Sequence, residues 1–318
     1  MVHISQRLGL RASLLVIHTL LLSIYSDNVL SLYGQEVAVT GDDTSLTSGI
    51  ADTIKRYAEG FNSTNAELLA SEIYSAPVLL IDPSSGTHRV LETTIDVEKQ
   101  LNQSFKEMKA NGWHHSTIHH QSVRMVGSDM VAVQTIFSRM RIDGSTILPA
   151  KRQANFLLVN QPSGWRIIVA CKGSHRELKD SASIEKLIKQ KMTRYVDLLN
   201  GPSPAKEVTE EIYSFPRLSR SFMGDREHKG MLSRDEVLQR LDGYLSKLKS
   251  EGMQKITVDK VKVFPVSSEL AFVDLTSCRV RSDGTPIPPA DAGFSYIWFK
   301  QAAGWKMIAT LAHGPEAK

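Results

Sequence analysis

The stretch RIDGSTILPA, residues 141–150, returns later in the chain as RSDGTPIPPA, residues 281–290. Outward from it, GWRIIVA at 164–170 returns as GWKMIAT at 304–310, again 140 residues later. Matches that keep their order at one long offset are typical of two diverged copies of a domain, because solenoid repeats recur every 20–50 residues or so. The sequence therefore predicts a tandem duplication.

The text upstream of this stretch is duplicated too. RYAEGFN at 56–62 matches RYVDLLN at 194–200, and EIYSAP at 72–77 matches EIYSFP at 211–216. A few residues further on the two copies differ, because IDP in the first copy is replaced by RSF in the second. Only the first copy therefore has an aspartate before proline at this point, Asp82.

The same order of helices and strands is expected in both copies. A first helix is expected at 50–62 and at 184–200, where apolar residues recur at helical spacing. After a short second helix, a third begins at Thr93 and at Ser233, each followed three residues later by an acid that completes a capping box. Four strands joined by turn residues follow, in copy one at 116–127, 129–142, 152–161 and 164–173. Helices followed by an antiparallel meander indicate the α+β class, with the helices on one face of the sheet.

Length and composition agree with two globular domains. The chain has 318 residues, of which 42% are hydrophobic and 23% charged, with a formal net charge of +4. Its basic residues are scattered among acidic ones, which argues against a nucleic-acid partner. The sequence contains no zinc-ligand spacing, P-loop or glycine-rich dinucleotide turn, so we expect no cofactor and no metal.

The N-terminus differs from the rest of the chain. Arg7 and Arg11 precede an apolar run at 12–25, a pattern typical of a secretory signal peptide. We expect a signal peptide at 1–34, a flexible leader at 35–49, and a secreted or periplasmic protein. The alternative is a membrane anchor formed by an uncleaved signal, although the run is short for a membrane span and no stable span is expected. The two domains are expected at 50–176 and 183–314.

Two local features have plain structural interpretations. WHHSTIHH at 113–120 places no two of its histidines close together on one face of a strand, so it favours a solvated strand edge over a metal site. Cys171 and Cys278 lie in apolar segments of strand-like sequence. This favours small buried hydrophobic residues over a disulfide, although an exported protein could form one.

These features together resemble the nuclear-transport-factor-2-like superfamily, and within it the SnoaL and ketosteroid-isomerase type. The resemblance rests on the helix with RY…N, on IDPSSG, on the capped helix and on the strands ending in GW. It covers nearly all of both copies. It implies two domains, each a curved antiparallel sheet with helices on one face that enclose a cone-shaped cavity. Domains of this superfamily commonly pair through their sheets, so two fused copies are expected to pair within the chain as a monomer, with a homodimer as the alternative.

The resemblance also implies a site in copy one. Asp82 matches the family's proton-transferring aspartate, and Tyr57 matches the tyrosine that donates to the developing oxyanion. An apolar cavity would raise the pKa of such an aspartate. The family's third residue, a protonated acid nine residues after the DG turn, corresponds to Gln153, a weaker donor. Asp82 before proline is also an ordinary turn signal.

Copy two lacks this set of residues. Tyr195 matches Tyr57, but Ser221 stands in the place of the aspartate and Gly293 in the place of the third residue. The family's proton-transfer mechanism therefore cannot operate in copy two. The ligand-binding candidates are Tyr57, Trp113, Gln153 and Tyr195.

Two functions remain open from the sequence. The first is an exported protein that binds a small apolar or carbonyl-bearing molecule, or a peptide, without turnover. The alternative is an isomerase, dehydratase or hydrolase of a small hydrophobic substrate, with Asp82 and Tyr57 as catalytic residues. The alternative requires the Asp82 carboxylate and the Tyr57 hydroxyl to point into one cavity. A third possibility, a structural protein, would have side chains filling both cones.

Overall fold

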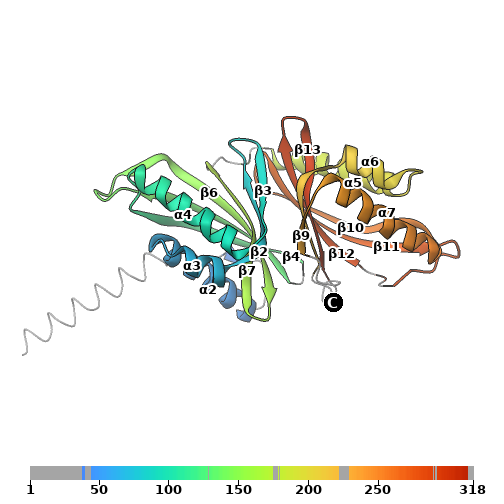
Figure 1. Cartoon of the computed structure of the whole chain (residues 1–318), viewed down its shortest axis with the longest axis horizontal. Helices are drawn as coiled ribbons and strands as arrows, with labels where there is room; N and C mark the ends of the chain where they lie inside the picture. Colours follow the sequence, from blue (N-terminus) through green and yellow to red (C-terminus); the bar gives the residue numbers. More distant parts are fainter. Residues whose placement is uncertain are drawn as a thin grey trace, which may run out of the picture.

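The computed structural model describes residues 38–39, 44–127, 129–174, 178, 180–221, 229–288, 290 and 292–313. The predicted signal peptide at 1–34 lies outside the described residues. Among the helices that are described, none is both long and apolar enough to cross a bilayer. Figure 1 shows two similar bodies side by side, with their helices on the outer sides and their strands toward the centre.

The first domain builds one curved sheet with helices on one face. Its elements are β1 (Ala38–Val39), α2 (Thr44–Asn62), α3 (Ala66–Leu68), a π-helical turn η1 (Leu69–Ile73), β2 (Tyr74–Asp82), β3 (Thr87–Leu91), α4 (Thr94–Ala110), β4 (His115–Gly127), β5 (Met130–Met140), β6 (Thr146–Gln161) and β7 (Gly164–Ser174). The strand order is β1-β4-β5-β6-β7-β2-β3. Because β2 pairs parallel with β7, and β1 with β4, the sheet is mixed rather than wholly antiparallel. Helix α2 begins at Thr44, inside the stretch predicted to be a leader.

The second domain repeats the order of helices and strands of the first, without a described counterpart of β1. It contains α5 (Ser181–Leu199), α6 (Pro204–Glu211), β8 (Tyr213–Ser221), β9 (Lys229–Leu232), α7 (Arg234–Ser250), β10 (Met253–Pro265), β11 (Leu270–Arg281), β12 (Ala292–Gln301) and β13 (Gly304–His313). Its strand order, β10-β11-β12-β13-β8-β9, is the order of β4 to β7, β2 and β3 in the first domain. The predicted duplication and the α+β class are therefore confirmed.

The predicted capping boxes start α4 and α7. The Thr93 hydroxyl accepts a hydrogen bond from the Asp96 amide at 3.2 Å, and the Asp96 carboxylate accepts one from the Thr93 amide at 3.1 Å. Ser233 and Glu236 form the same reciprocal pair in the second domain. Such a cap satisfies amides that the first helical turn leaves free, and losing it costs about 1 kcal/mol.

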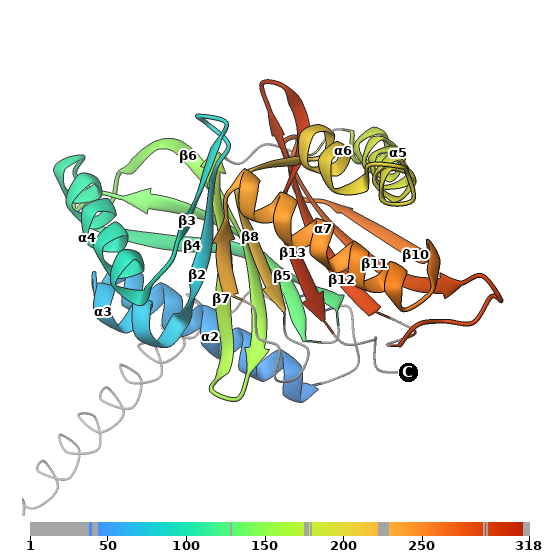
Figure 2. The same ribbon diagram turned by 45° about the vertical axis from the view of Figure 1, so that its right-hand side comes forward.

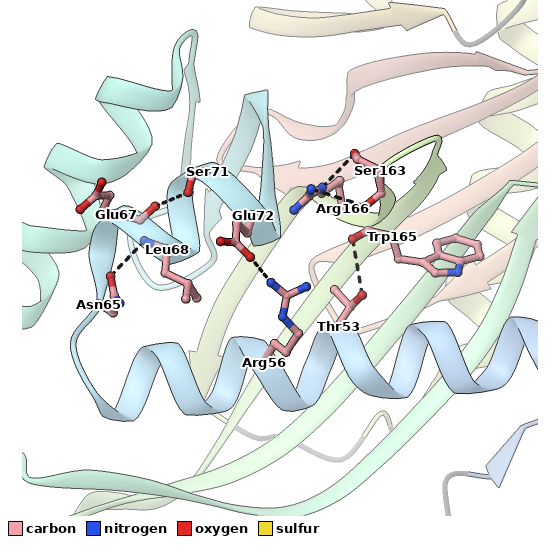
Figure 3. Close-up of polar contacts among 10 residues, drawn as sticks. All are labelled: Thr53, Arg56, Asn65, Glu67, Leu68, Ser71, Glu72, Ser163, Trp165 and Arg166. Carbon is pink, nitrogen blue, oxygen red and sulfur yellow. Dashed lines mark hydrogen bonds and ion pairs between the residues drawn. The ribbon is translucent and has the colours of Figure 1, made fainter.

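The duplicated RY and EIY motifs form an ion pair between helices. Arg56 on α2 pairs with Glu72 on η1, as Figure 3 shows. The second domain repeats the pair as Arg194 and Glu211, with Nη2 and Oε2 2.8 Å apart. In Figure 3 the Thr53 hydroxyl also donates to the Trp165 carbonyl at 3.5 Å, which fastens α2 to the start of β7.

The asparagine that ends each RY…N motif joins the first helix to the sheet. The Asn62 amide donates to the Ser116 carbonyl at 3.1 Å and accepts from the Ser116 amide at 2.8 Å. Asn200 makes the same two bonds to Ile256, at 2.9 and 2.8 Å. In each domain the asparagine side chain bonds the backbone of β4 or β10 as a neighbouring strand would. These two bonds fix where the helix ends against the strand, so the motif belongs to the scaffold.

The two sheets pack against each other through the faces that their helices leave free (Figure 2). A core cluster joins the domains and contains only residues from strands, among them Leu79, Leu157, Phe272, Ile297 and Phe299. The helices pack on two other clusters, one in each domain. Each sheet therefore buries both of its faces, and the domains pair within one chain.

Polar contacts complete this domain interface. Arg220 on β8 is only 1% exposed and donates from Nη1 and Nη2 to the carbonyl and hydroxyl of Ser75, at 3.1 and 2.9 Å. The Nε2 atom of His88 on β3 lies 2.7 Å from the Pro216 carbonyl, and its Nδ1 atom lies 3.2 Å from the Gln301 amide nitrogen.

Candidate functional site

A cavity of about 690 Å³ opens between α4 and the sheet of the first domain. Its apolar walls include Val78, Leu80 and Leu101. Its size lies within the roughly 300–1,000 Å³ of typical small-molecule sites. The expectation of a cone-shaped hollow in the first domain therefore holds.

Three half-buried cations project into this cavity from neighbouring strands: Arg139 on β5, Arg152 on β6 and Lys172 on β7. Within the described chain, the side chains of Arg139 and Lys172 form no hydrogen bond and no ion pair, although the Nζ atom of Lys172 lies 5.0 Å from the centre of the Phe61 ring. The Nε atoms of Arg139 and Arg152 are buried without a hydrogen-bond partner, although Arg152 donates from Nη2 to the Leu148 carbonyl at 2.6 Å. No described carboxylate forms an ion pair with any of the three.

The pKa values of these groups reflect the missing counter-charge. Burial, and then the charge of Arg139, lowers the pKa of Lys172 to about 8. Burial, and then the charge of Arg152, lowers the pKa of Arg139 to about 10. Burial and like-charge repulsion both disfavour the charged form, so keeping these side chains charged at neutral pH costs free energy.

Strand alternation explains why these side chains converge. On β6, Arg152 and Ala154 face the helices, so the residue between them, Gln153, faces the other domain. Gln153 is 5% exposed and donates to the Asn155 side chain at 3.0 Å and to the Val266 carbonyl of the second domain at 3.4 Å. Gln153 therefore lies at the domain interface, outside the cavity.

Asp82 is an exposed turn residue at the end of β2, on the rim of the cavity. Its Oδ1 atom accepts hydrogen bonds from the Ser84 amide at 2.9 Å and from the Ser84 hydroxyl at 2.5 Å. Partial burial raises the pKa of the carboxyl, but the bonds from Ser84 and Ser85 outweigh it, and the pKa is lowered. The raised pKa that the sequence predicted for a base in an apolar cone is not found.

Tyr57 lines a second, smaller cavity of about 40 Å³ next to the first. Its ring packs edge-on against Phe156, with centroids 5.0 Å apart, and burial raises the pKa of its hydroxyl. Arg139 and Lys172 line both cavities, whereas Asp82 lines only the large one. The two proposed catalytic residues therefore do not share a cavity.

Trp113 lies in the hydrophobic core and lines neither of these cavities. Its ring stacks on Phe105 at 6.3 Å, and its Nε1 atom donates to the Ser116 hydroxyl at 3.0 Å. Tyr195, by contrast, lines a cavity of about 230 Å³ in the second domain.

The histidines and cysteines have structural surroundings. His119 lies 2.6 Å from the Ser138 hydroxyl, and His114 contacts His115 through their Nδ1 atoms. Among the residues that the structure describes, no three His, Cys, Asp or Glu side chains are grouped closely enough to hold a metal ion. Both cysteines are free thiols; Cys171 is buried in the interface cluster, as expected from the sequence, whereas Cys278 is half-buried.

A family model described as NTF2-like protein (DUF6841) matches residues 28–174 and again residues 180–315. The chain belongs to this NTF2-like family. No curated protein matches it.

Three of the solved structures similar to the chain are described as NTF2-like or as having a cystatin-like fold. An NTF2-like protein with a cystatin-like fold from Novosphingobium aromaticivorans is 16% identical, with a TM-score of 0.34. The match covers 45% of this chain and 89% of the Novosphingobium chain. A domain of unknown function with a cystatin-like fold from Nostoc punctiforme is 14% identical, with a TM-score of 0.35, covering 50% and 96%. An NTF2-like superfamily protein from Salmonella enterica is 13% identical, with a TM-score of 0.33, covering 44% and 97%.

Sequence reasoning missed the three cations. One signal was present: Arg139 and Arg279 stand at the same place before the two DG turns, in RMRIDG and RVRSDG. Arg139 and Arg279 each line the cavity of their own domain.

Proposed function

We propose that this NTF2-like protein is an exported binding protein whose first domain holds a small organic anion with an apolar body, without turnover. The observation that carries the proposal is the cluster of Arg139, Arg152 and Lys172 around a cavity of about 690 Å³. Among the described residues, no carboxylate forms an ion pair with any of these three cations. A carboxylate is the carbonyl-bearing group that fits this surrounding. Export rests on the predicted signal peptide.

The physical argument is one of charge compensation. Cations that are half-buried without counter-charges repel one another and have lost part of their hydration. A bound anion would relieve both costs, and the planar fork of arginine suits the two oxygens of a carboxylate. The apolar wall formed by Val78, Leu80 and Leu101 would take the body of the ligand.

Binding is favoured over catalysis by the position of Asp82. A general base must reach the proton that it removes and needs a pKa near the working pH. Asp82 is exposed, its pKa is lowered, and it lines a different cavity from Tyr57. This supports binding over the isomerase, dehydratase or hydrolase alternative, which requires both side chains in one cavity.

The test uses octanoate as the probe and the purified chain as the protein. Isothermal titration calorimetry should detect octanoate binding and much weaker binding of octanol, which has the same chain length without the charge. Lys172→Met should weaken octanoate binding at least tenfold. Lys151→Met, on the same sheet but exposed, is the matched control and should change nothing. Equal binding of octanol, or equal effects of the two variants, would contradict the proposal.

A further inference from the structure

The second domain encloses a cavity of its own between α5, α7 and the sheet, about 230 Å³ in volume. Figure 2 shows α5 and α7 above this sheet. Five aromatic side chains line it: Tyr195, Tyr213, Tyr244, Phe294 and Tyr296. The rings of Tyr195 and Tyr296 meet edge-on at 5.6 Å, and the Phe294 and Tyr296 rings stack at 6.1 Å. The cavity is thus an aromatic box.

Two buried arginines enter this box. Arg217 on β8 is 4% exposed, its Cζ atom lies 3.7 Å from the centre of the Tyr213 ring, and its Nη2 atom donates to the Thr310 hydroxyl. Its Nε atom is buried without a hydrogen-bond partner. Arg279 on β11 lies with its Cζ atom 5.7 Å from the centre of the Phe294 ring. No aspartate or glutamate occurs among the described residues that line the cavity.

Comparison of the copies explains why this cavity differs from the first. Ala154 and Ser104 of the first domain correspond to Phe294 and Tyr244 of the second, so aromatic rings occupy space that the first domain leaves open. The second cation has also moved. Lys172 of β7 corresponds to Ala312 of β13, while Arg217 of β8 replaces Val78 of β2. The two domains therefore offer positive charge in cavities of different size and lining.

Hydrogen-bond donors complete the second cavity. The hydroxyls of Tyr195 and Tyr213 lie 3.2 Å apart, and burial raises the pKa of Tyr195, so this hydroxyl keeps its proton across the physiological range. A neutral phenol beside a guanidinium can donate to the oxygen of an anion. A ligand that suits the box is flat, smaller than a drug-sized molecule, and carries one negative group.

We propose that this cavity is a second ligand site, for a monocyclic aromatic carboxylate whose carboxylate is bound by Arg217 and Arg279 and whose ring lies among the aromatic side chains. Aromatic rings prefer offset or edge-on neighbours, and the box supplies them. The site is independent of the anion site in the first domain.

The test uses benzoate as the probe on the full chain, measured by calorimetry and by ligand-observed NMR. Benzoate should bind, benzyl alcohol should bind at least tenfold more weakly because it lacks the charge, and cyclohexanecarboxylate should bind more weakly because its ring is not aromatic. Equal binding of benzyl alcohol, or no benzoate binding at millimolar concentration, would overturn the proposal.

Variants locate the binding in one domain. Arg217→Met should lower benzoate affinity at least tenfold, whereas Lys172→Met should leave it unchanged while weakening octanoate. The reverse result, loss of benzoate binding in Lys172→Met alone, would place benzoate in the first domain and overturn the proposal. If Arg217→Met does not fold, Tyr296→Phe and Phe294→Ala replace it. These carry the residues that the first domain has at the same positions, and they should weaken benzoate and leave octanoate binding intact.

Discussion

Replacement of Lys172 by methionine is expected to stabilise the ligand-free protein at neutral pH. Burial, and then Arg139, lowers the pKa of this lysine from 10.5 to about 8. At about 1.4 kcal/mol per pH unit the difference corresponds to roughly 3 kcal/mol, which partial exposure reduces to about 2 kcal/mol. The Nζ atom lies 5.0 Å from the centre of the Phe61 ring, a contact that offsets about 0.5–1 kcal/mol. Methionine has a similar length and fills the space. The variant should therefore gain about 1 kcal/mol.

The pH dependence of this gain follows from proton binding. Between pH 8 and 10.5 the unfolded chain holds the Lys172 proton while the folded chain has released it, so the stability of the wild type rises with pH in this window. The advantage of the variant should be constant below pH 8 and should shrink as the pH approaches 10.5.

Urea unfolding at pH 6.5 and pH 10 measures both effects. Lys151→Met, an exposed lysine on the neighbouring strand, is the control and should change the free energy of unfolding by less than about 0.5 kcal/mol. The reasoning fails if Lys172→Met is less stable than the wild type at pH 6.5, or if its gain is as large at pH 10 as at pH 6.5.

Four further outcomes are expected. Octanoate affinity should fall about tenfold between pH 7 and pH 9 in calorimetry, because Lys172 loses its charge near pH 8; a flat profile would contradict its role. Burial lowers the pKa of His88, so stability should fall as the pH drops below 6.5, and urea unfolding of His88→Gln should lack this slope. Asp82→Asn should leave octanoate affinity unchanged in calorimetry, whereas a measurable loss would return Asp82 to the site. Thr93→Ala and Ser233→Ala should each cost about 1 kcal/mol in urea unfolding, and a much smaller loss in both would mean that the capping boxes contribute little.

The scaffold could be predicted from the sequence because its motifs occur in both copies. The capped helices, the DG turns and the RY…N motif recur at matched positions, and each recurrence marks a local interaction that any copy of the fold needs. Asn62 and Asn200 illustrate this, because each makes the same two hydrogen bonds to the corresponding strand of its sheet, β4 or β10. The parallel pairing of β2 with β7 could not be predicted, because it joins segments that lie far apart in the sequence.

The site was less readable, for two physical reasons. Counting residues along β6 placed Gln153 near the site, but a strand turns every second side chain to the other face, so Arg152 faces the cavity instead. For Asp82 the sequence left a turn and a catalytic base both open. The turn is found, because the Ser84 amide and hydroxyl bind the Asp82 carboxylate locally and lower its pKa. The cations come from three strands, and only the folded sheet brings them together.

The contact between Arg220 and Ser75 has a consequence for how the two halves can change. The residue that corresponds to Arg220 in the first domain is Ile81, and the counterpart of Ser75 is Ser214. In an assembly of two identical subunits, one codon would place a guanidinium at both positions and bury two charges in the interface. Fusion of the two domains lets a substitution occur on one side only, so the contact surface can become asymmetric, and each cavity can acquire a different chemistry without disturbing the other.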